Sequence, residues 1–525
     1  MKHAATVCIL TAGKGTRMGT CGEHINKALL PLAGKAIISH IIGKFPQDTA
    51  YVVGTGYLSD QVEHYLAIAH PDRNITCVTI DNYDGPGSGP GYSLLCCSSH
   101  LQRPFYFVSC DTLWDNQLPP PGDFNWLGVA SVPGDDTARY CNMRVADGCI
   151  VELRDKQKVD DPTYQAFVGL CYIYDHGVFW KSLGDKSTIA GERQVSNGLR
   201  ELIKNCRVKA QHVEWTDVGD AEKYKQAVLR FEEYDFSKTN EYLYMVGGKV
   251  IKFFVDHKVT AMRVQKASLN PGVFPAITDH TDGFYAYQYQ PGETLYRRNS
   301  FAIFASLLQW LEANLWKPVA IDPPVIAEAC RRFYRDKTIK RIEAYQKKHH
   351  IADAGAVING TEIPPMKDLL AKVPWDLLEQ GVACFMHGDL QFDNIIYDAA
   401  TRTFKLLDWR QDFDGHVEFG DIYYDVAKMY GGMILNYDFI KKNLLSYCED
   451  DQGVYYDFAQ RHNAAAYIDI LTCYVVNRGW DIDKVRLLVA IIYLNMSPLH
   501  TYPFDKMLYA LGRKMLATEL GMAKD

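Results

Sequence analysis

The chain has 525 residues, more than one hydrophobic core usually organises, so two globular domains of roughly 200–300 residues each are expected. Apolar residues make up 47% and charged residues 23% of the chain, a composition that excludes extensive disorder. A net charge of −7 with dispersed Lys and Arg argues against a nucleic-acid partner. The sequence has neither a signal-peptide pattern nor an apolar run near the roughly 18 residues of a spanning helix, and this predicts a cytoplasmic protein without a membrane partner.

The first predicted element is a buried strand at residues 6–10, which leads into a glycine-rich, cationic turn. The turn reads Thr11-Ala12-Gly13-Lys14-Gly15-Thr16-Arg17-Met18. Glycines let backbone N–H groups approach phosphate oxygens, and the N-terminus of a following helix would favour an anion. Lys27 follows within the segment NKALLPLAGK at residues 26–35. This arrangement predicts a triphosphate site.

Together these segments resemble the signature of the sugar-phosphate and phosphocholine nucleotidyltransferases, (A/G)GxGTRM followed by KxLLPLxGK, although the usual Lys-Pro is Lys27-Ala28 here. The resemblance implies a Rossmann-like domain with a mostly parallel sheet over residues 1–232. It also implies that Lys27 and Arg17 are the catalytic cations that neutralise phosphate charge. Nucleotide binding is assigned by the same resemblance to Leu10, Ala12, Gly13, Lys14, Gly15 and Thr16.

Two carboxylates are expected to hold Mg²⁺ on the α-phosphate. The segment PFYFVSCD at residues 104–111 reads as a buried strand that delivers Asp111 at its C-terminal end, where open α/β sheets bind ligands. The segment EWTDVG at residues 214–219 resembles the family's W-x-D-x-G, which makes Asp217 the second predicted metal ligand.

Two further segments lie where the family places substrate contacts. The glycine-rich residues 84–93 fall at the loop that reads the nucleobase, so the resemblance implies base contacts by Gly87, Ser88 and Gly89. The same glycines would also suit a tight connection. Lys156 stands where sugar-type members bind the acceptor phosphate with Glu-Lys-Pro. The Pro is missing here, so the role of Lys156 in binding the acceptor phosphate stays open.

The domain boundary is predicted between the helical pattern of residues 221–231 and the alternating pattern of residues 242–254, which gives domains 1–232 and 236–525. The alternating segment is expected to form a β-hairpin that turns at Gly247-Gly248. From Ser300 onward, long amphipathic patterns predict a helical lobe, so the second domain is expected to be an α+β, two-lobed, protein-kinase-like fold.

The strongest motif of the second half is FMHGDLQFDN at residues 385–394, followed by Leu407-Asp408-Trp409. A phosphoryl transfer to a hydroxyl needs a proton acceptor and magnesium ligands around ATP. The pattern HGDxxxxN…(L/I)DW resembles the aminoglycoside-phosphotransferase and choline-kinase superfamily. This implies that Asp389 is the catalytic base and that Asn394 and Asp408 bind Mg²⁺. The alternative is that His387 and Asp389 only cap a loop.

Lys252 in the predicted hairpin is expected to bind the ATP phosphates. No acidic residue lies between Asp256 and Asp279, so either Lys252 is oriented differently or its partner comes from elsewhere. An inactive kinase-like half is the remaining alternative. Trp409 and Asp412 are predicted to bind substrate, because aromatic faces and carboxylates recognise ammonium groups and also sugars. Arg410 in the same stretch suits a carboxylate or a phosphate instead.

The two expected activities form one sequence of reactions. A kinase would phosphorylate a small amino alcohol, polyol or sugar with ATP, and a nucleotidyltransferase would join the product to a second NTP, with CTP favoured and Mg²⁺ at both sites, for cell-envelope polysaccharide or lipid decoration. One alternative is a sugar-1-phosphate uridylyl- or guanylyltransferase with an anomeric sugar kinase, and another is a transferase regulated by a non-catalytic kinase-like half. The expected partners are small molecules and nucleotides; homo-oligomerisation stays open.

Overall fold

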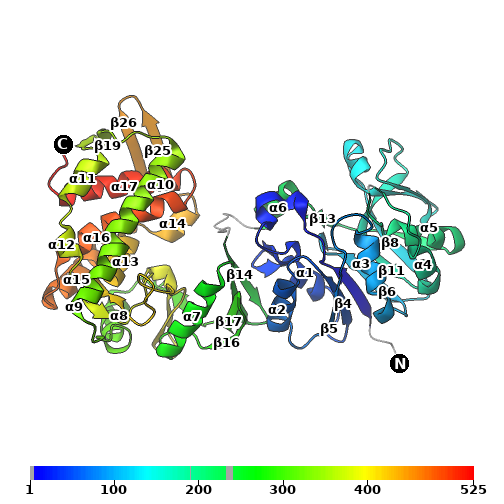
Figure 1. Ribbon diagram of the computed structural model, residues 1–525, viewed down its shortest axis with the longest axis horizontal. Helices are drawn as coiled ribbons and strands as arrows, with labels where there is room; N and C mark the ends of the chain where they lie inside the picture. Colours follow the sequence, from blue (N-terminus) through cyan, green and yellow to red (C-terminus); the bar gives the residue numbers. More distant parts are fainter. Residues whose placement is uncertain (1–4, 190, 232–239, 525) are drawn as a thin grey trace. The chain divides into compact units, whose positions relative to one another are not determined.

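The structure is a computed structural model that describes residues 5–189, 191–231 and 240–524 (Figure 1). It has two compact units. The first consists of Met1–Asp256 with Asp279–Ala286, and the second of His257–Thr278 with Tyr287–Asp525. Both units mix helices and strands, as the predicted fold class requires.

A nine-stranded sheet forms the centre of the first unit, in the order β5-β4-β1-β6-β11-β8-β12-β10-β9. Its strands are β1 (Thr6–Leu10), β4 (Ala50–Thr55), β5 (Asn74–Thr79), β6 (Phe105–Ser109), β8 (Asn125–Ala130), β9 (Cys141–Ala146), β10 (Cys149–Asp155), β11 (Tyr164–Ile173) and β12 (Val208–His212). Strands β5, β4, β1 and β6 are parallel, as predicted. Beyond them the sheet is mixed, because β11 runs antiparallel to β6, β8 and β9.

Among the described residues, two pairs of short strands and six α-helices complete this part of the first unit. The short strands are β2 (Pro31–Leu32), β3 (Lys35–Ala36), β7 (Thr112–Trp114) and β13 (Trp215–Asp217). The helices are α1 (Ile37–Gly43), α2 (Ser59–Ala69), α3 (Pro90–Cys96), α4 (His176–Leu183), α5 (Ser196–Asn205) and α6 (Ala221–Phe231).

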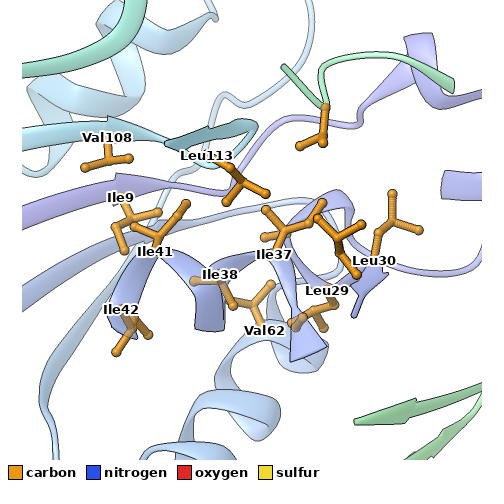
Figure 2. Packing of buried hydrophobic residues seen from close by; sticks show 14 of the residues in the cluster. Ile9, Leu29, Leu30, Ile37, Ile38, Ile41, Ile42, Val62, Val108 and Leu113 are labelled. Atoms are coloured by element: carbon orange, nitrogen blue, oxygen red, sulfur yellow. The ribbon is translucent and has the colours of Figure 1, made fainter. Parts of the chain in front are cut away.

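Helices cover both faces of the sheet. Because successive residues of a strand point to opposite faces, each strand contributes side chains to two cores. In β1, Ile9 packs into a core formed with α1, α2 and α6, whereas Cys8 and Leu10 pack into a second core with α3, α4 and α5. Figure 2 shows the first core, where Ile9 and Val108 of the sheet lie near the isoleucines of α1. The two cores hold the ends of β1 and β6 in place, and these ends carry the predicted site.

The predicted hairpin is present as β14 (Glu241–Val246) and β15 (Lys249–Phe254), within a sheet of order β14-β15-β17-β16 that includes β16 (Ile277–His280) and β17 (Phe284–Gln288). Its turn residues Gly247 and Gly248 have φ of 58° and 75°, the left-handed conformation that a two-residue hairpin turn requires.

The hairpin shares the core of the first unit. The Tyr244 hydroxyl donates to the Leu29 carbonyl at 2.8 Å, and its ring lies 4.9 Å from that of Tyr65. Tyr242 and Phe253 are buried in the same cluster. The first compact unit therefore extends beyond the predicted boundary at residues 232–236, because the aromatic face of the hairpin is buried against α2.

The second unit is largely helical from Ser300 onward, as predicted, and Ser300 caps the first of these helices by accepting from the Ile303 N–H. Its helices are α7 (His257–Leu269), α8 (Phe301–Asn314), α9 (Pro323–Cys330), α10 (Lys337–His349), α11 (Met366–Lys372), α12 (Trp375–Leu378), α13 (Ile422–Ile434), α14 (Tyr437–Lys441), α15 (Ala464–Asn477), α16 (Ile482–Met496) and α17 (Phe504–Glu519). Within the described residues, no helix combines the length and apolarity needed to cross a bilayer.

Three small sheets accompany these helices. They contain β18 (Glu293–Thr294), β22 (Ile395–Asp398) and β23 (Thr403–Leu406); β19 (Ala356–Ile358), β20 (Thr361–Ile363), β25 (Leu445–Asp450) and β26 (Gly453–Phe458); and β21 (Ala383–Cys384) with β24 (Gly420–Asp421). The hairpin of β22 and β23 connects the two parts of the kinase-like motif, since β22 follows Asn394 and Leu407 follows β23.

Ile38 tests the contribution of the first core to stability. Its side chain is fully buried, so Ile38→Ala should lower the free energy of unfolding of the first unit by about 2–5 kcal/mol and Ile38→Val by only about 0.5–1.5 kcal/mol. Urea unfolding of the full chain measures both. Leu229→Ala, at a side chain 73% exposed, is the control, and an equal effect of Leu229→Ala and Ile38→Ala would contradict this assignment.

Candidate active sites

The first site begins where β7 and β13 pair. They run antiparallel with Asp217 opposite Thr112, so Asp217 lies next to Asp111, the residue before β7. The Val218 N–H donates to the Asp111 carbonyl at 3.1 Å. A Cβ on Gly219 would lie 2.7 Å from Asp217 Oδ1 and 3.4 Å from Asp111 Oδ2. The structure thus brings together the two carboxylates predicted from separate motifs.

Lys27 connects the glycine-rich loop region to these carboxylates. Its Nζ donates to Asp111 Oδ2 at 2.7 Å and to the Gly219 carbonyl at 3.1 Å, and the Ser109 hydroxyl donates to Asp111 Oδ1 at 2.6 Å. Burial alone would raise the pKa of Asp111, but the charge and hydrogen bond of Lys27, with smaller effects of Ser109 and Arg17, lower it well below its usual value. Asp111 is therefore a carboxylate at neutral pH.

Asp217 is held by two residues that the sequence motifs did not identify. Its Oδ2 accepts from the Tyr140 hydroxyl at 2.8 Å and from Lys223 Nζ at 2.7 Å, while its Oδ1 accepts from the Gly219 N–H at 2.8 Å. Burial opposes the charge on Lys223, but its bonds to Asp217 and Tyr140 outweigh that cost and raise its pKa. Lys223 follows the W-x-D-x-G segment closely in sequence, whereas Tyr140 is distant and carries no local signal.

The pair of carboxylates fits Mg²⁺, a hard cation that prefers oxygen ligands. In the described parts of the chain, no three His, Cys, Asp or Glu side chains are grouped to hold a metal. Asp111 and Asp217 would thus supply two ligands, and phosphate oxygens and water the others, which is the usual way that Mg²⁺ binds with a nucleotide.

The glycine-rich loop follows β1, but the helix expected after it is a short 3-10 segment, Thr16–Gly22, interrupted at Gly19. The predicted helix dipole at this loop is therefore wrong, because Gly19 adopts φ 53° and breaks the turn. Lys14 is exposed and pairs with Asp84 at 2.6 Å, and Arg17 is also exposed. Positive side chains, rather than a helix terminus, supply the charge of the loop.

The remaining loop positions fall into two groups. Gly13 and Thr16 are exposed and Gly15 is half-buried with φ 63°, whereas Leu10 and Ala12 are buried and offer only backbone groups. Asn26, which the motif analysis missed, donates to the carbonyls of Thr11 and Tyr57 at 3.0 and 2.7 Å. Because Asn26 also caps the turn that begins at Lys27, it ties the loop to the lysine.

Part of the segment predicted to bind the base makes hydrogen bonds and close contacts within the protein. The Gly87 N–H donates to the Gly191 carbonyl at 2.8 Å, and the Ser88 N–H donates within the turn to Gly85. Gly89, at φ 110°, packs so closely on Arg193 that a Cβ would lie 2.7 Å from its carbonyl oxygen. These contacts support the tight-connection interpretation of Gly87 and Ser88, and base reading stays a prediction.

Lys156 lies directly after β10 with φ 52°, and its Nζ is 3.7 Å from Glu192 Oε2. Its N–H donates to the carbonyl of Tyr140, the residue whose hydroxyl bonds Asp217. Lys156 is thereby connected through the backbone to the carboxylate site, and its role toward an acceptor phosphate stays a prediction.

The second site is centred on the loop after β21. Asp425 of α13 is fully buried and accepts from the N–H groups of His387 and Gly388 at 2.8 and 2.6 Å and from the Trp316 indole at 3.1 Å. Burial raises the pKa of Asp425 despite these donors. Asp425 thus supports the loop that presents Asp389.

Both predicted catalytic carboxylates of this unit are paired with buried cations. Asp389 Oδ1 lies 2.7 Å from Lys428 Nζ, and Asp408 Oδ1 lies 2.6 Å from Arg263 Nη1. Asn394 donates to the Asp389 carbonyl at 2.8 Å. Burial favours the neutral form of Asp389, but the Lys428 charge outweighs it and lowers the pKa. Lys428 and Arg263 are site residues that the motifs missed, since each comes from a helix far from the loop in sequence.

The side chains of Asp408 and Asn394 fit Mg²⁺, as the carboxylates of the first site do. Asp408 offers a carboxylate and Asn394 an amide oxygen, both hard ligands, and the charges of Asp389 and Asp408 are close enough to affect each other. Since Arg263 occupies one oxygen of Asp408, a bound Mg²⁺ would use its other oxygen or replace Arg263.

Two other predicted residues, Lys252 and Asp412, also make specific contacts. Lys252 is 3% exposed and its Nζ lies 3.6 Å from Glu241 Oε1, so its carboxylate partner comes from the neighbouring strand β14 rather than from the following helix. Asp412 accepts from the Gly415 N–H at 2.6 Å and stabilises its own loop.

Trp409 packs within the second unit. Its side chain is fully buried, its indole N–H donates to the Arg263 carbonyl at 2.9 Å, and its ring lies 4.7 Å from that of Phe274. Direct substrate binding by Trp409 stays a prediction, and its complete burial argues against it. Its aromatic face is used to pack the loop against α7.

Known proteins resemble the two halves separately. Residues 7–117 match the model of the MobA-like NTP transferase domain, and residues 265–460 match the model of the phosphotransferase enzyme family. The chain is 26% identical over 215 residues to the bifunctional protein GlmU of Methanococcus aeolicus, covering 40% of this chain and 50% of that protein. It is 24% identical over 230 residues to the bifunctional IPC transferase and DIPP synthase of Archaeoglobus fulgidus, covering 42% of each.

The chain thus spans about half the length of these two relatives, or less. Among solved structures, the inositol-1-phosphate CTP transferase from T. maritima is similar with 16% identity and a TM-score of 0.36, over 44% of this chain and 97% of that one. This likeness is too distant to carry a functional argument. The two family models, placed in this order, confirm a fusion of a nucleotidyltransferase-type region with a phosphotransferase-type region.

Gly219 gives a direct test of the first site. In Gly219→Ala the new Cβ would lie 2.7 Å from Asp217 Oδ1, so the carboxylates must shift, and nucleotidyl transfer should fall about 100-fold, as expected for a displacement near 1 Å. Pyrophosphate release measures the loss. Gly177→Ala in α4, where a Cβ meets no atom within 4 Å, is the matched control. Full activity of Gly219→Ala would contradict the proposed site.

His387 should make the stability of the second unit depend on pH. Burial lowers its pKa to about 4, and its ring accepts from the Asp389 N–H at Nδ1, so it is neutral with the proton on Nε2 facing the Leu407 carbonyl. The unfolded chain takes up a proton near pH 6.5 and the folded chain only near 4, so stability is lost as pH falls through this window, by about 2 kcal/mol at pH 5.

Urea unfolding at pH 7.5 and pH 5 measures this loss. His387→Gln should have a lower free energy of unfolding than the parent chain at pH 7.5. At pH 5 the difference between the two free energies of unfolding should be smaller by about 2 kcal/mol. The exposed His257→Gln is the control for replacing a histidine at the surface. A pH-independent effect of His387→Gln would show that the histidine is not held neutral.

Proposed function

We propose that this chain, in which a MobA-like nucleotidyltransferase region precedes a phosphotransferase-family region, is a bifunctional enzyme that phosphorylates a small hydroxyl compound and then activates the product as a nucleotide conjugate. One observation carries the proposal: a single chain holds two separate carboxylate sites, Asp111 with Asp217 and Asp389 with Asp408, and in each site every carboxylate is paired with a positive side chain.

In the kinase reaction, the hydroxyl oxygen of the acceptor would attack the γ-phosphorus of ATP, and the bond to ADP would break. Asp389 would accept the hydroxyl proton, and its lowered pKa makes it ionised and ready to do so. Asn394 and Asp408 would hold Mg²⁺, which supplies charge neutralisation at the phosphates. Lys252 is proposed as the ATP lysine.

In the second reaction, the new phosphate ester would attack the α-phosphorus of an NTP and release pyrophosphate. Asp111 and Asp217 would hold Mg²⁺, while Lys14, Arg17 and Lys27 would balance phosphate charge. Catalysis would then depend on positioning and electrostatics, without a covalent enzyme intermediate. CTP is the favoured NTP on the phosphocholine-type motif, and the acceptor is an amino alcohol, polyol or sugar destined for cell-envelope polysaccharide or lipid.

A second candidate function has its own support. Asp389 and Asp408 are already neutralised by Lys428 and Arg263, an arrangement that would also suit a ligand-binding, non-catalytic kinase-like half that regulates the transferase. The two candidates differ in ATP turnover, which only the first predicts.

The test is an assay of the full chain with Mg²⁺ and each of CTP, UTP, GTP and ATP against a panel of phosphomonoesters, followed by ADP formation with the corresponding hydroxyl compounds. Asp111→Asn should abolish pyrophosphate release and leave ADP formation intact, and Asp389→Asn should do the reverse. Absence of ADP formation with every acceptor, in a folded protein with an active transferase, would favour the regulatory alternative. Loss of both activities in either folded variant would contradict two independent sites.

A further inference from the structure

The kinase-like unit has a group of positive side chains beside its catalytic loop that the proposed reaction does not use. Lys337 and Arg341 lie one turn apart on α10, and Arg410 follows Trp409. Within the described part of the chain, none of the three has a carboxylate within the 4.0 Å of an ion pair. We call these three residues the cationic group.

The cationic group lies next to Asp389. The Arg410 N–H donates to the His387 carbonyl at 3.0 Å, and Arg410 packs so closely on Gly388 that a Cβ there would lie 2.6 Å from Arg410 Cβ. Gly388 directly precedes Asp389. Lys428, the partner of Asp389, adds a further positive charge to the same region.

The members of the cationic group are also close to one another. Lys337 Nζ lies 3.9 Å and Arg410 Cζ 5.0 Å from the centre of the same ring, Phe333. Burial, followed by the charges of Arg410, Arg341 and Lys428, lowers the pKa of Lys337 well below its usual value. Burial and Arg410 likewise lower the pKa of Arg341. An anion bound among these positive charges would relieve their mutual repulsion, so the cationic group favours an anionic ligand.

A positively charged acceptor meets three obstacles here. The cation–π face of Phe333 is already covered by Lys337 and Arg410, and Trp409 is buried, so these aromatic rings do not serve a quaternary ammonium group. The nearby Asp412 carboxylate already accepts the Gly415 N–H at 2.6 Å. An ammonium group would also be repelled by the positive charges of the cationic group.

We propose that the acceptor phosphorylated by this unit carries an anionic group, a carboxylate or a phosphate ester, which the cationic group binds while the acceptor hydroxyl faces Asp389. The inference rests on the proposed kinase function and specifies its substrate class: a hydroxy acid or a phosphorylated polyol, not a choline-type alcohol. Arg410 is the residue best suited to a planar carboxylate or a phosphate, because its guanidinium can bind two oxygens at once, and its Nε–H is directed to the Asp412 carbonyl at 3.0 Å.

The experiment measures ADP formation by the full chain with ATP and Mg²⁺ and four small hydroxyl compounds of different charge: glycerate, glycerol 3-phosphate, glycerol and choline. Glycerate or glycerol 3-phosphate should be preferred, and the stronger of the two identifies a carboxylate or a phosphate ester. Preference for choline, or equal rates with glycerol and both anions, would overturn the inference.

Variants separate binding from chemistry. Lys337→Gln and Arg410→Gln should each raise KM for the anionic acceptor about tenfold to hundredfold, with little change in kcat and none in the KM of glycerol, since a lost charge-assisted hydrogen bond has this size. Lys340→Gln, an exposed lysine of the same helix, is the matched control. Because Lys337 lies on a helix away from the loop, it tests the inference even if Arg410→Gln does not fold. Unchanged KM in Lys337→Gln would count against it.

A binding measurement distinguishes this inference from the proposed function. Calorimetric titration of Asp389→Asn with the same four compounds reports acceptor affinity without turnover. Binding of an anionic compound, lost in Lys337→Gln/Asp389→Asn, with no ADP formation by the parent chain, would support the anion site and refute the kinase. ADP formation from neutral or cationic acceptors alone would support the kinase and refute the anion site.

Discussion

Two carboxylates that lie close together repel each other and favour proton uptake, and this cost constrains both candidate sites. In the first unit, Lys27 and Lys223 each bind one carboxylate of the pair Asp111 and Asp217. In the second unit, Lys428 and Arg263 do the same for Asp389 and Asp408. The ionised state that metal binding and proton transfer require is therefore built into each fold, and the cations are as much part of the sites as the carboxylates.

Three of these four cations, all except Lys27, come from helices that the catalytic motifs do not include. Lys223 lies on α6, Arg263 on α7 and Lys428 on α13, and Arg263 and Lys428 are among the buried residues of their helices. Site and core are thus positioned by the same packing, since a helix held by its apolar face has little freedom to move its charged side chain. A substitution in the core that moves one of these helices should therefore also move its charged side chain away from the carboxylate.

The hairpin of β14 and β15 has a double role in the proposed scheme. Through Lys252 it is the expected ATP-binding element of the kinase, and through Tyr244 it shares the core of the first unit. Buried aromatic surface of this kind is lost only at a considerable cost in free energy. The kinase-like region is therefore not an appendage that could be removed at residue 236 without exposing part of the core of the first unit.

The sequence by itself determined the order of the two regions, the strand that delivers Asp111, the hairpin turn at Gly247 and Gly248, and the helical lobe from Ser300. These features follow from local rules: strand and helix periodicity, the left-handed conformation of glycine, and short motifs whose residues are close in sequence. For the same reason, Asp111, Asp217, Asp389 and Asp408 could be named as candidates from residue types at defined spacings, and their roles stay predictions.

Only the tertiary structure decided which residues surround those motifs. The partners Tyr140, Lys223, Arg263 and Lys428 lie far from the carboxylates in sequence or outside the motifs, and no periodicity signals a pairing that depends on how helices pack. The burial of Trp409 is likewise visible only in the structure, since an aromatic residue after Asp408 reads the same in sequence whether it lines a pocket or fills a core. The interruption of the expected helix at Gly19 likewise depends on the backbone conformation that packing selects for a permissive residue.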